Sequence, residues 1–108
     1  MTVVTVTRKD GSIVEVECDG HTDYGEEGED IVCAALSSVV QTAVLGLMQV
    51  VGVNVDLKRD AVRGYLKMRL PELTREMRRD ADTVLNTMLC GISDLHEGFS
   101  RFIKLEVK

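Results

Sequence analysis

A histidine and a cysteine, His21 and Cys33, stand close enough in the chain to work as a pair, with eleven residues between them. Asp30 is a typical helix-capping residue, so the sequence predicts that Cys33 lies at the third position of a helix. In that first turn, unpaired backbone N–H groups and the positive end of the helix dipole favour the thiolate. A neighbouring imidazole would stabilise the thiolate as an ion pair and return the proton to a leaving amine. The pair therefore predicts a cysteine nucleophile with a histidine base.

The residues around Cys33 fit a reaction centre. Two alanines follow it and leave room beside the sulfur, and the N–H groups of the first turn could stabilise an oxyanion. Ser37 lies one helical turn further on the same face. Asp30 and Ser37 could each hold His21. Helix capping is the favoured role for Asp30, whereas back-bonding within the helix is as plausible for Ser37 as a role in the site.

Residue types alone leave other roles open. A single cysteine on an apolar helix is usually a small buried hydrophobe. A thiol redox or sensing protein would need a resolving cysteine, and Cys18 ends a strand just before His21, whereas Cys90 lies deep in a later helix. A non-catalytic binding module would tolerate serine at Cys33. The cysteines and His96 do not complete a zinc spacing, so the sequence predicts no metal and no other cofactor.

The strand that precedes His21 belongs to a predicted hairpin. Residues 2–8 and 13–18 both alternate apolar and polar side chains, and an Asp-Gly pair at 10–11 lies between them. Asp-Gly is a strong signal for a tight hairpin turn. The second strand is expected to direct three side chains inward: Val14, Val16 and Cys18.

The segment that carries Cys33 is predicted to be a loop followed by a long helix. Residues 19–29 contain three glycines and many acids, typical of a surface loop, and Gly25 and Gly28 are expected to be hinges of a lid over the substrate. The helix runs from Asp30 to about Val51, with Gly52 as its C-terminal cap. It is apolar nearly all round, which predicts cover on more than one side and a homodimer.

The second half of the chain repeats the ββα order. Residues 53–58 and 61–70 predict a hairpin that turns at 59–60, and residues 71–95, opened by a proline, predict an amphipathic helix. A last strand covers about 99–107. The resulting order, ββαββαβ, predicts a two-layer α+β fold with both helices on one face of a mostly antiparallel sheet.

Composition limits the class of protein. The 108 residues are 44% hydrophobic and 29% charged, with one proline, which predicts a single globular domain over residues 1–108. A net charge of −5 disfavours nucleic acid as a direct ligand. The long apolar segment 31–55 is interrupted by polar residues, so we expect a buried helix and no membrane association. With no signal peptide and an odd number of cysteines, the chain is expected to be cytoplasmic.

A family resemblance sharpens these expectations. Gly20-His21 is followed, after a glycine-bearing loop, by residues 28–37, which read Gly-Glu-Asp-Ile-Val-Cys-Ala-Ala-Leu-Ser. This run resembles the signature of the bacterial ribosomal-processing cysteine protease family, Prp: Gly-His, a loop, then Gly-x-Asp-Ile-Val-Cys-Ala-Ala-x-Ser. The length and the predicted element order fit the family across nearly the whole chain. One departure is Thr22, where the family usually has alanine, and another is the unusually acidic loop.

The resemblance implies a specific activity. Members of the family remove a short N-terminal extension from large-subunit ribosomal protein twenty-seven, act as homodimers, and carry a mobile loop over the active site. By resemblance, Cys33 is the nucleophile and His21 the base, and the acid and hydroxyl of the motif are Asp30 and Ser37. Gly20 belongs to the same motif. The expected partners are therefore a ribosomal protein precursor, through its N-terminal extension peptide, and a second copy of the chain.

Overall fold

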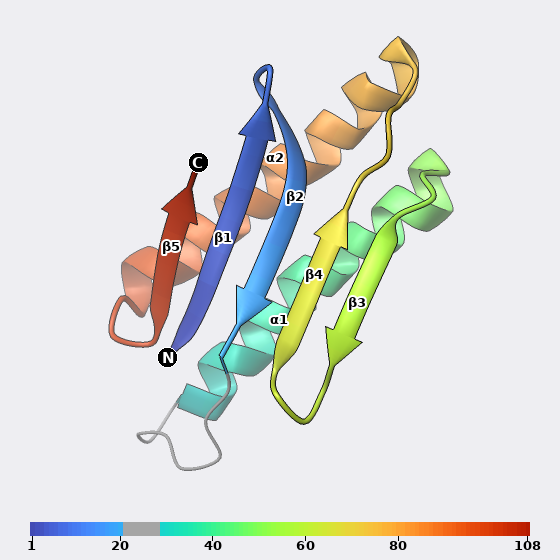
Figure 1. Ribbon diagram of the computed structural model, residues 1–108. Helices are drawn as coiled ribbons and strands as arrows, with labels where there is room; N and C mark the ends of the chain where they lie inside the picture. The colour runs from blue at the N-terminus through green and yellow to red at the C-terminus, as the bar shows by residue number, and fades with distance from the viewer. Residues whose placement is uncertain (21–28) are drawn as a thin grey trace.

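A computed structural model describes residues 1–20 and 29–108, and it has two layers (Figure 1). The sheet contains β1 (Thr2–Lys9), β2 (Ser12–Asp19), β3 (Asp56–Asp60), β4 (Tyr65–Arg69) and β5 (Ile103–Val107). The helices are α1 (Glu29–Leu45), continued by the π-helical segment η1 (Gly46–Val51), and α2 (Arg75–Gly98). Both helices lie behind one face of the sheet in Figure 1. The predicted α+β class and the order ββαββαβ are confirmed.

Strands β1 and β2 are neighbours in the interior of the sheet. The strand order is β3-β4-β2-β1-β5, and every neighbouring pair is antiparallel except β1 with β5. Because α2 returns the chain along the back of the sheet, β5 enters at the edge beside β1 and runs parallel to it. The start of β1 and the end of β2 therefore lie side by side, at the end of the sheet where α1 begins (Figure 1).

The first hairpin forms as predicted, with one difference in its inward face. Asp10 and Gly11 both have positive φ, 53° and 84°, as a two-residue hairpin turn with right-handed strand twist requires. Thr7 pairs with Glu15 but Arg8 pairs with Ile13, so β2 carries an extra residue and the alternation shifts. As a result Ile13 is buried and Val14 only partly so. The expectation that Val14 points inward was wrong because alternation alone does not reveal a bulge.

The second hairpin turns later than the sequence suggested. Strand β3 ends at Asp60, and the turn spans residues 61–64 rather than 59–60. The Asp60 carboxylate accepts hydrogen bonds from the backbone N–H groups of Val62 and Arg63, 3.1 and 3.2 Å away, and Gly64 has a φ of 71°. Asp60 thus nucleates the turn with its own side chain, and Gly64 supplies the left-handed residue.

Helix α2 also begins later than expected. The Thr74 hydroxyl accepts a hydrogen bond from the Met77 N–H at 3.2 Å, so Thr74 is the N-cap and the helix starts at Arg75. Pro71 therefore lies in the connection before the helix rather than at its first position. The helix keeps the predicted amphipathic pattern, and its fully buried stripe consists of Ala81, Leu85, Met88 and Ile92.

Helix α1 and η1 form the other half of the core. The segment Ile31–Val51 is long and apolar enough to cross a membrane by length and composition, with a mean hydropathy of 2.0. Its inward side packs in the hydrophobic core with the sheet and α2, through Val32, Leu36, Val40, Ala43, Val44 and Leu47. Gly52 ends it in the left-handed conformation, as predicted. Core packing accounts for its inner face, while Leu45 and Val50 are 53% and 83% exposed on the outer side.

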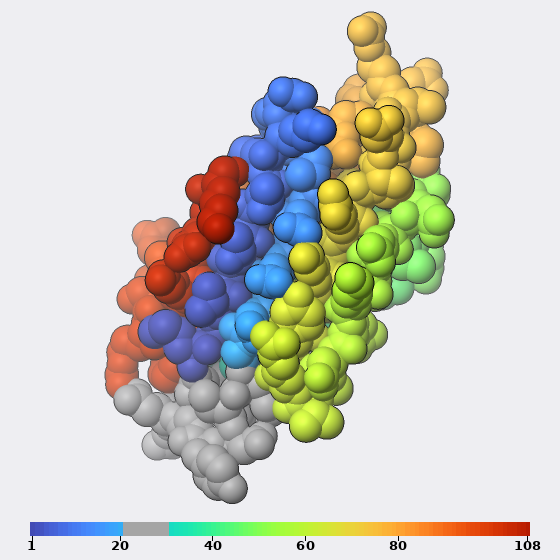
Figure 2. Space-filling view, viewed as in Figure 1, coloured from blue at the N-terminus to red at the C-terminus, as the bar shows by residue number. Residues whose placement is uncertain are grey.

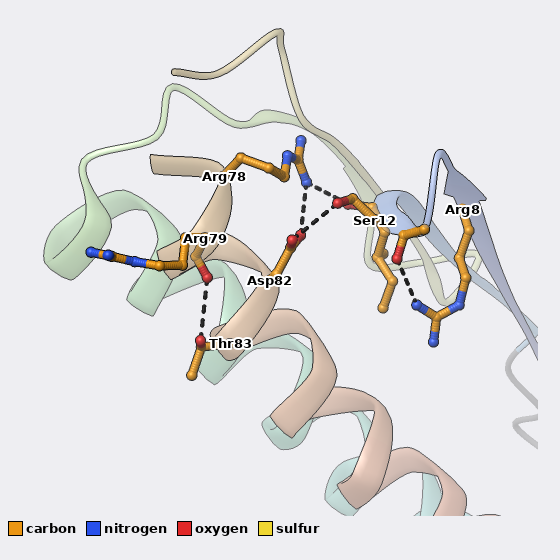
Figure 3. Close-up of polar contacts among 8 residues, drawn as sticks. Arg8, Ser12, Arg78, Arg79, Asp82 and Thr83 are labelled. Carbon is orange, nitrogen blue, oxygen red and sulfur yellow. Dashed lines mark hydrogen bonds and ion pairs between the residues drawn. The ribbon is translucent and has the colours of Figure 1, made fainter. Parts of the chain in front are cut away.

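A polar network joins the first hairpin to α2 (Figure 3). The Arg78 guanidinium donates to the backbone carbonyl of Ile13 at 3.0 Å and lies 3.4 Å from the Asp82 carboxylate. The Ser12 hydroxyl donates to the other oxygen of Asp82 at 3.0 Å. The carboxylate thus bridges the helix and the strand end, far along the sheet from the start of α1 (Figure 1).

Candidate functional site

Cys33 lies near the N-terminus of α1, although not at the expected helical position. The helix begins at Glu29, so Asp30 is inside the first turn and Cys33 is the fifth helical residue rather than the third. The backbone N–H groups of the first turn have no carbonyl partner within the helix, by helix geometry. Cys33 is partly exposed and directly follows the residues that carry these N–H groups. This placement keeps the thiol accessible and near the positive end of the helix dipole.

The Cys33 sulfur has a defined polar neighbour. The Thr2 Oγ1 lies 3.4 Å from the Cys33 Sγ. The Thr2 hydroxyl donates to the Gly20 carbonyl oxygen at 3.0 Å. A hydroxyl has one hydrogen to donate, so in this arrangement the Cys33 S–H is the donor and the Thr2 oxygen accepts. Thr2 therefore links the cysteine to the residue that directly precedes His21 in the chain.

Gly20 is held against the first residues of β1. Its φ is 123°, and a Cβ placed on it would lie 2.3 Å from the Met1 carbonyl oxygen and 3.1 Å from the Thr2 Cα. Only glycine permits this approach without displacement of the backbone. The Gly20 N–H also donates to the Gly64 carbonyl at 3.3 Å. The end of β2 is therefore tied both to β1 and to the β3–β4 turn.

A cavity of about 610 Å³ opens beside Cys33. Its buried or partly buried apolar lining comes from β2, β4 and α1 and comprises Cys18, Leu36, Val40 and Leu66. Polar residues from α1 and the second hairpin also line it: Ser37, Gln41, Arg59, Asp60 and Tyr65. An apolar base with a few polar groups at its edge is typical of a site that binds a small ligand or peptide side chain.

The second hairpin is fixed against β2 next to this cavity. Arg63 Nη2 lies 2.7 Å from Asp19 Oδ2, and the guanidinium stacks 4.5 Å from the centre of the Tyr65 ring. The Tyr65 hydroxyl donates to the Glu17 carboxylate at 2.7 Å, and this hydrogen bond raises the pKa of the Tyr65 hydroxyl. The tyrosine therefore stays protonated as a donor. These contacts lie on the face of the sheet that points away from the helices, which Figure 2 shows in front.

Some of the predicted site residues can be placed and others cannot. Ser37 lines the cavity one turn after Cys33, and its oxygen accepts a hydrogen bond from the Gln41 side-chain amide. Gly20 lies at the same end of the sheet. His21, and the hinges predicted at positions 25 and 28, lie outside the described residues, as does the side chain of Asp30. Their roles stay predictions from the sequence.

The other two cysteines differ in environment. Cys18 lines the same cavity as Cys33, and burial, with a smaller contribution from the Glu17 charge, raises the pKa of its thiol to about 12. Cys90 is exposed on α2 and does not line this cavity. All three thiols are free of disulfides. Cys18 is therefore near Cys33, as the redox alternative requires, but it is protonated at neutral pH and a poor nucleophile.

Sequence reasoning missed two parts of the site. Thr2 was treated only as a strand residue, and the turn residues of the second hairpin were not connected with Cys33. A signal for Thr2 was present, because it shares its face of the strand with Val4 and Val6 and is thus a polar residue directed into the core. The turn offered no such signal, since its approach to β2 depends on the pairing of distant strands.

Comparisons with known proteins point to one family of enzymes. Residues 1–104 match the model of a protein family described as cysteine protease Prp. The ribosomal processing cysteine protease Prp of Staphylococcus aureus (strain Mu50) is 30% identical over 108 residues, which span 100% of this chain and 99% of the relative. The protein of the same name from Bacillus subtilis (strain 168) is 29% identical over 103 residues, 92% of this chain and 90% of the relative. A crystal structure of Prp from S. aureus with a substrate peptide superposes with a TM-score of 0.89, at 30% identity and full coverage of both chains.

Proposed function

Because the chain belongs to the Prp family of cysteine proteases, we propose that it removes the N-terminal extension of a ribosomal protein precursor, with Cys33 as nucleophile and His21 as base. The observation that carries this proposal is the position of the Cys33 sulfur. It lies near the start of a helix, beside a cavity of about 610 Å³, and within hydrogen-bond distance of a threonine that also binds the residue preceding His21.

The chemistry proceeds in two halves. His21 takes the proton from Cys33, and the thiolate attacks the scissile carbonyl carbon to form a C–S bond. As the C–N bond breaks, His21 returns the proton to the leaving amine. Water, deprotonated by the same histidine, then hydrolyses the thioester and regenerates the thiol. Backbone N–H groups in the first turn of α1 are the donors proposed for the oxyanion in both halves.

The proposed substrate is the precursor of large-subunit ribosomal protein twenty-seven. An S. aureus Prp has been crystallised with a substrate peptide and with a covalently linked product peptide, which supports peptide binding and covalent chemistry in that relative. Here the apolar lining contributed by Leu36, Val40 and Leu66 suits an apolar side chain of an extended peptide. The test is incubation with the precursor, with the new N-terminus read by mass spectrometry and the mature protein without its extension as the control. Failure to shorten the precursor would contradict this substrate.

We also propose that the protein acts in the cytoplasm as a homodimer, one domain of residues 1–108 per copy, without direct contact to nucleic acid. The free thiols and the net charge of −5 support the location and the absence of a nucleic acid ligand. The exposed apolar residues Leu45, Met48 and Val50 at the end of α1 and in η1 support self-association. Sedimentation at micromolar concentration should give twice the 11.9 kDa of the chain, and a single species of 11.9 kDa would contradict the dimer.

A thiol redox role remains the second candidate because Cys18 and Cys33 line one cavity. The raised pKa of Cys18, about 12, argues against it, since a resolving cysteine must react as thiolate. A non-catalytic binding module would keep its function with serine at position 33. Loss of processing in Cys33→Ser, together with retained processing in Cys18→Ala, would exclude both alternatives.

A further inference from the structure

Thr2 is unusual within the core. In the part of the chain that the structure describes, it is the one polar side chain that is buried, with 5% of its surface exposed. Its neighbours on the same strand face, Val4 and Val6, are fully buried and apolar. A hydroxyl in such a place costs free energy unless both its hydrogen and its oxygen are used. Here the hydrogen is directed to Gly20 and the oxygen faces Cys33.

The backbone around Thr2 leaves its side chain little freedom. The Thr2 N–H donates to the Phe102 carbonyl at 2.9 Å, and Thr2 pairs with Ile103 across the parallel ladder. On the other side β1 pairs with β2 up to Asp19, and Gly20 then approaches the Thr2 Cα closely. The hydroxyl is therefore held from both sides at a fixed point beside the sulfur. Threonine is β-branched, so rotation of the Thr2 side chain about χ1 is restricted as well.

We propose that Thr2 is a positioning residue for the Cys33 sulfur, one that accepts from the thiol at rest and donates to the thiolate during the reaction. This inference rests on the proposed function, in which Cys33 is the nucleophile. When the thiol proton leaves, the sulfur can only accept. The Thr2 hydroxyl then turns its one hydrogen from the Gly20 carbonyl to the Sγ, and a charge-assisted hydrogen bond replaces a neutral one. Once the C–S bond forms, the sulfur loses its charge and the hydrogen returns to Gly20, so no proton is gained or lost by Thr2.

The hydroxyl also couples two parts of the site. At rest it holds the Cys33 sulfur on one side and the end of β2 on the other. A misplaced sulfur would lower the rate of attack without much effect on peptide binding, because the cavity lining from Leu36, Val40 and Leu66 would be unchanged. The expected signature is thus a loss in kcat with little change in KM.

The test compares Thr2→Val, which replaces the hydroxyl by a methyl group of similar size, with Thr2→Ser, which keeps the hydroxyl. Thr5→Val is the matched control, because Thr5 lies on the same strand with its side chain on the opposite face of the sheet. We expect Thr2→Val to lower kcat about ten-fold, with KM within two-fold of the wild type. Thr2→Ser should recover most of the rate, and Thr5→Val should match the wild type.

A second readout does not depend on peptide cleavage. Iodoacetamide labelling of Cys33 at neutral pH, followed by peptide mass spectrometry, should slow about ten-fold in Thr2→Val, while labelling of the exposed Cys90 in the same molecules stays constant. If Thr2→Val does not fold, Thr2→Ala and Thr2→Ser, which differ only in the hydroxyl, replace it. Labelling and kcat within two-fold of the wild type in a folded variant without the hydroxyl would overturn the inference. If Cys33→Ala cleaved normally, the proposed function would fail instead, and the labelling would still report on the Thr2–Cys33 contact.

Discussion

Cys18 and Cys33 line the same cavity, one from the end of β2 and the other from the start of α1, but their thiols lie in different environments. Cys18 is half-buried against the core beside Glu17, and burial, with a smaller contribution from the Glu17 charge, raises the pKa of its thiol to about 12 from an ordinary value of 9.0. Cys33 is partly exposed near a helix N-terminus. Proximity thus does not make the two thiols equivalent.

This difference predicts the pH dependence of labelling. Since a raised pKa keeps Cys18 protonated, iodoacetamide should label Cys33 at neutral pH and leave Cys18 unlabelled until the pH approaches 12 or the protein unfolds. Peptide mass spectrometry at pH 7, 9 and 10, with a sample unfolded in urea as the control, measures this. Equal labelling of Cys18 and Cys33 in the folded protein at pH 7 would contradict the assignment of Cys33 as the reactive thiol.

Replacement of the proposed base should slow cleavage strongly. His21→Ala should lower the rate roughly 10²–10⁴-fold, the usual range for general acid–base catalysis. His96, in the last turn of α2, provides the matched control, and His96→Ala should retain wild-type turnover. Thiol labelling of Cys33 should also slow in His21→Ala. Identical labelling and turnover in both variants would show that His21 does not act on Cys33.

Gly20 should not tolerate a side chain. In Gly20→Ala the new Cβ would meet the Met1 carbonyl oxygen at 2.3 Å, at a φ of 123°. We expect a loss of about 1–3 kcal/mol in the free energy of unfolding and a disturbed Thr2–Cys33 contact. Gly98→Ala, where a Cβ meets nothing within 4 Å, should be nearly neutral. Urea unfolding measures both, and a Gly20→Ala variant as stable and as active as Gly98→Ala would contradict this close approach.

The network of Ser12, Arg78 and Asp82 (Figure 3) should affect stability but not catalysis. Asp82→Ala removes the acceptor shared by Ser12 and Arg78, and should lower the free energy of unfolding by about 1–2 kcal/mol. The control is Asp80→Ala, which breaks an exposed pair with Arg79 and should cost less than about 0.5 kcal/mol. A large drop in kcat for folded Asp82→Ala would contradict the separation of this network from the site.

Local patterns were enough to predict much of the fold. Alternation in β1, the Asp-Gly turn and the Gly52 cap each depend on neighbouring residues, and each formed as expected. The errors came from competing local signals or from distant pairing. Thr74 outcompeted Pro71 as the start of α2, and the bulge at the end of the first hairpin exchanged Val14 for Ile13 in the core.

The same distinction applies to the site. The position of Cys33 near a helix N-terminus follows from sequence neighbours, and only its place within the first turns was misjudged. Its contact with Thr2 joins residues thirty-one positions apart and requires β1, β2 and α1 to meet. The approach of the β3–β4 turn, through Arg63 and Asp19, likewise depends on which strands pair. Sequence patterns do not specify such contacts before the sheet order is known.

The central claim, that Cys33 is the nucleophile of a peptidase, has one most direct measurement. Wild type, Cys33→Ala and Cys90→Ala would each be incubated with the ribosomal protein precursor, and the shortened product followed by mass spectrometry over time. Thermal unfolding would first establish that all three are folded. We predict cleavage by the wild type and by Cys90→Ala, and none by Cys33→Ala. Turnover by folded Cys33→Ala near the wild-type rate would contradict the claim.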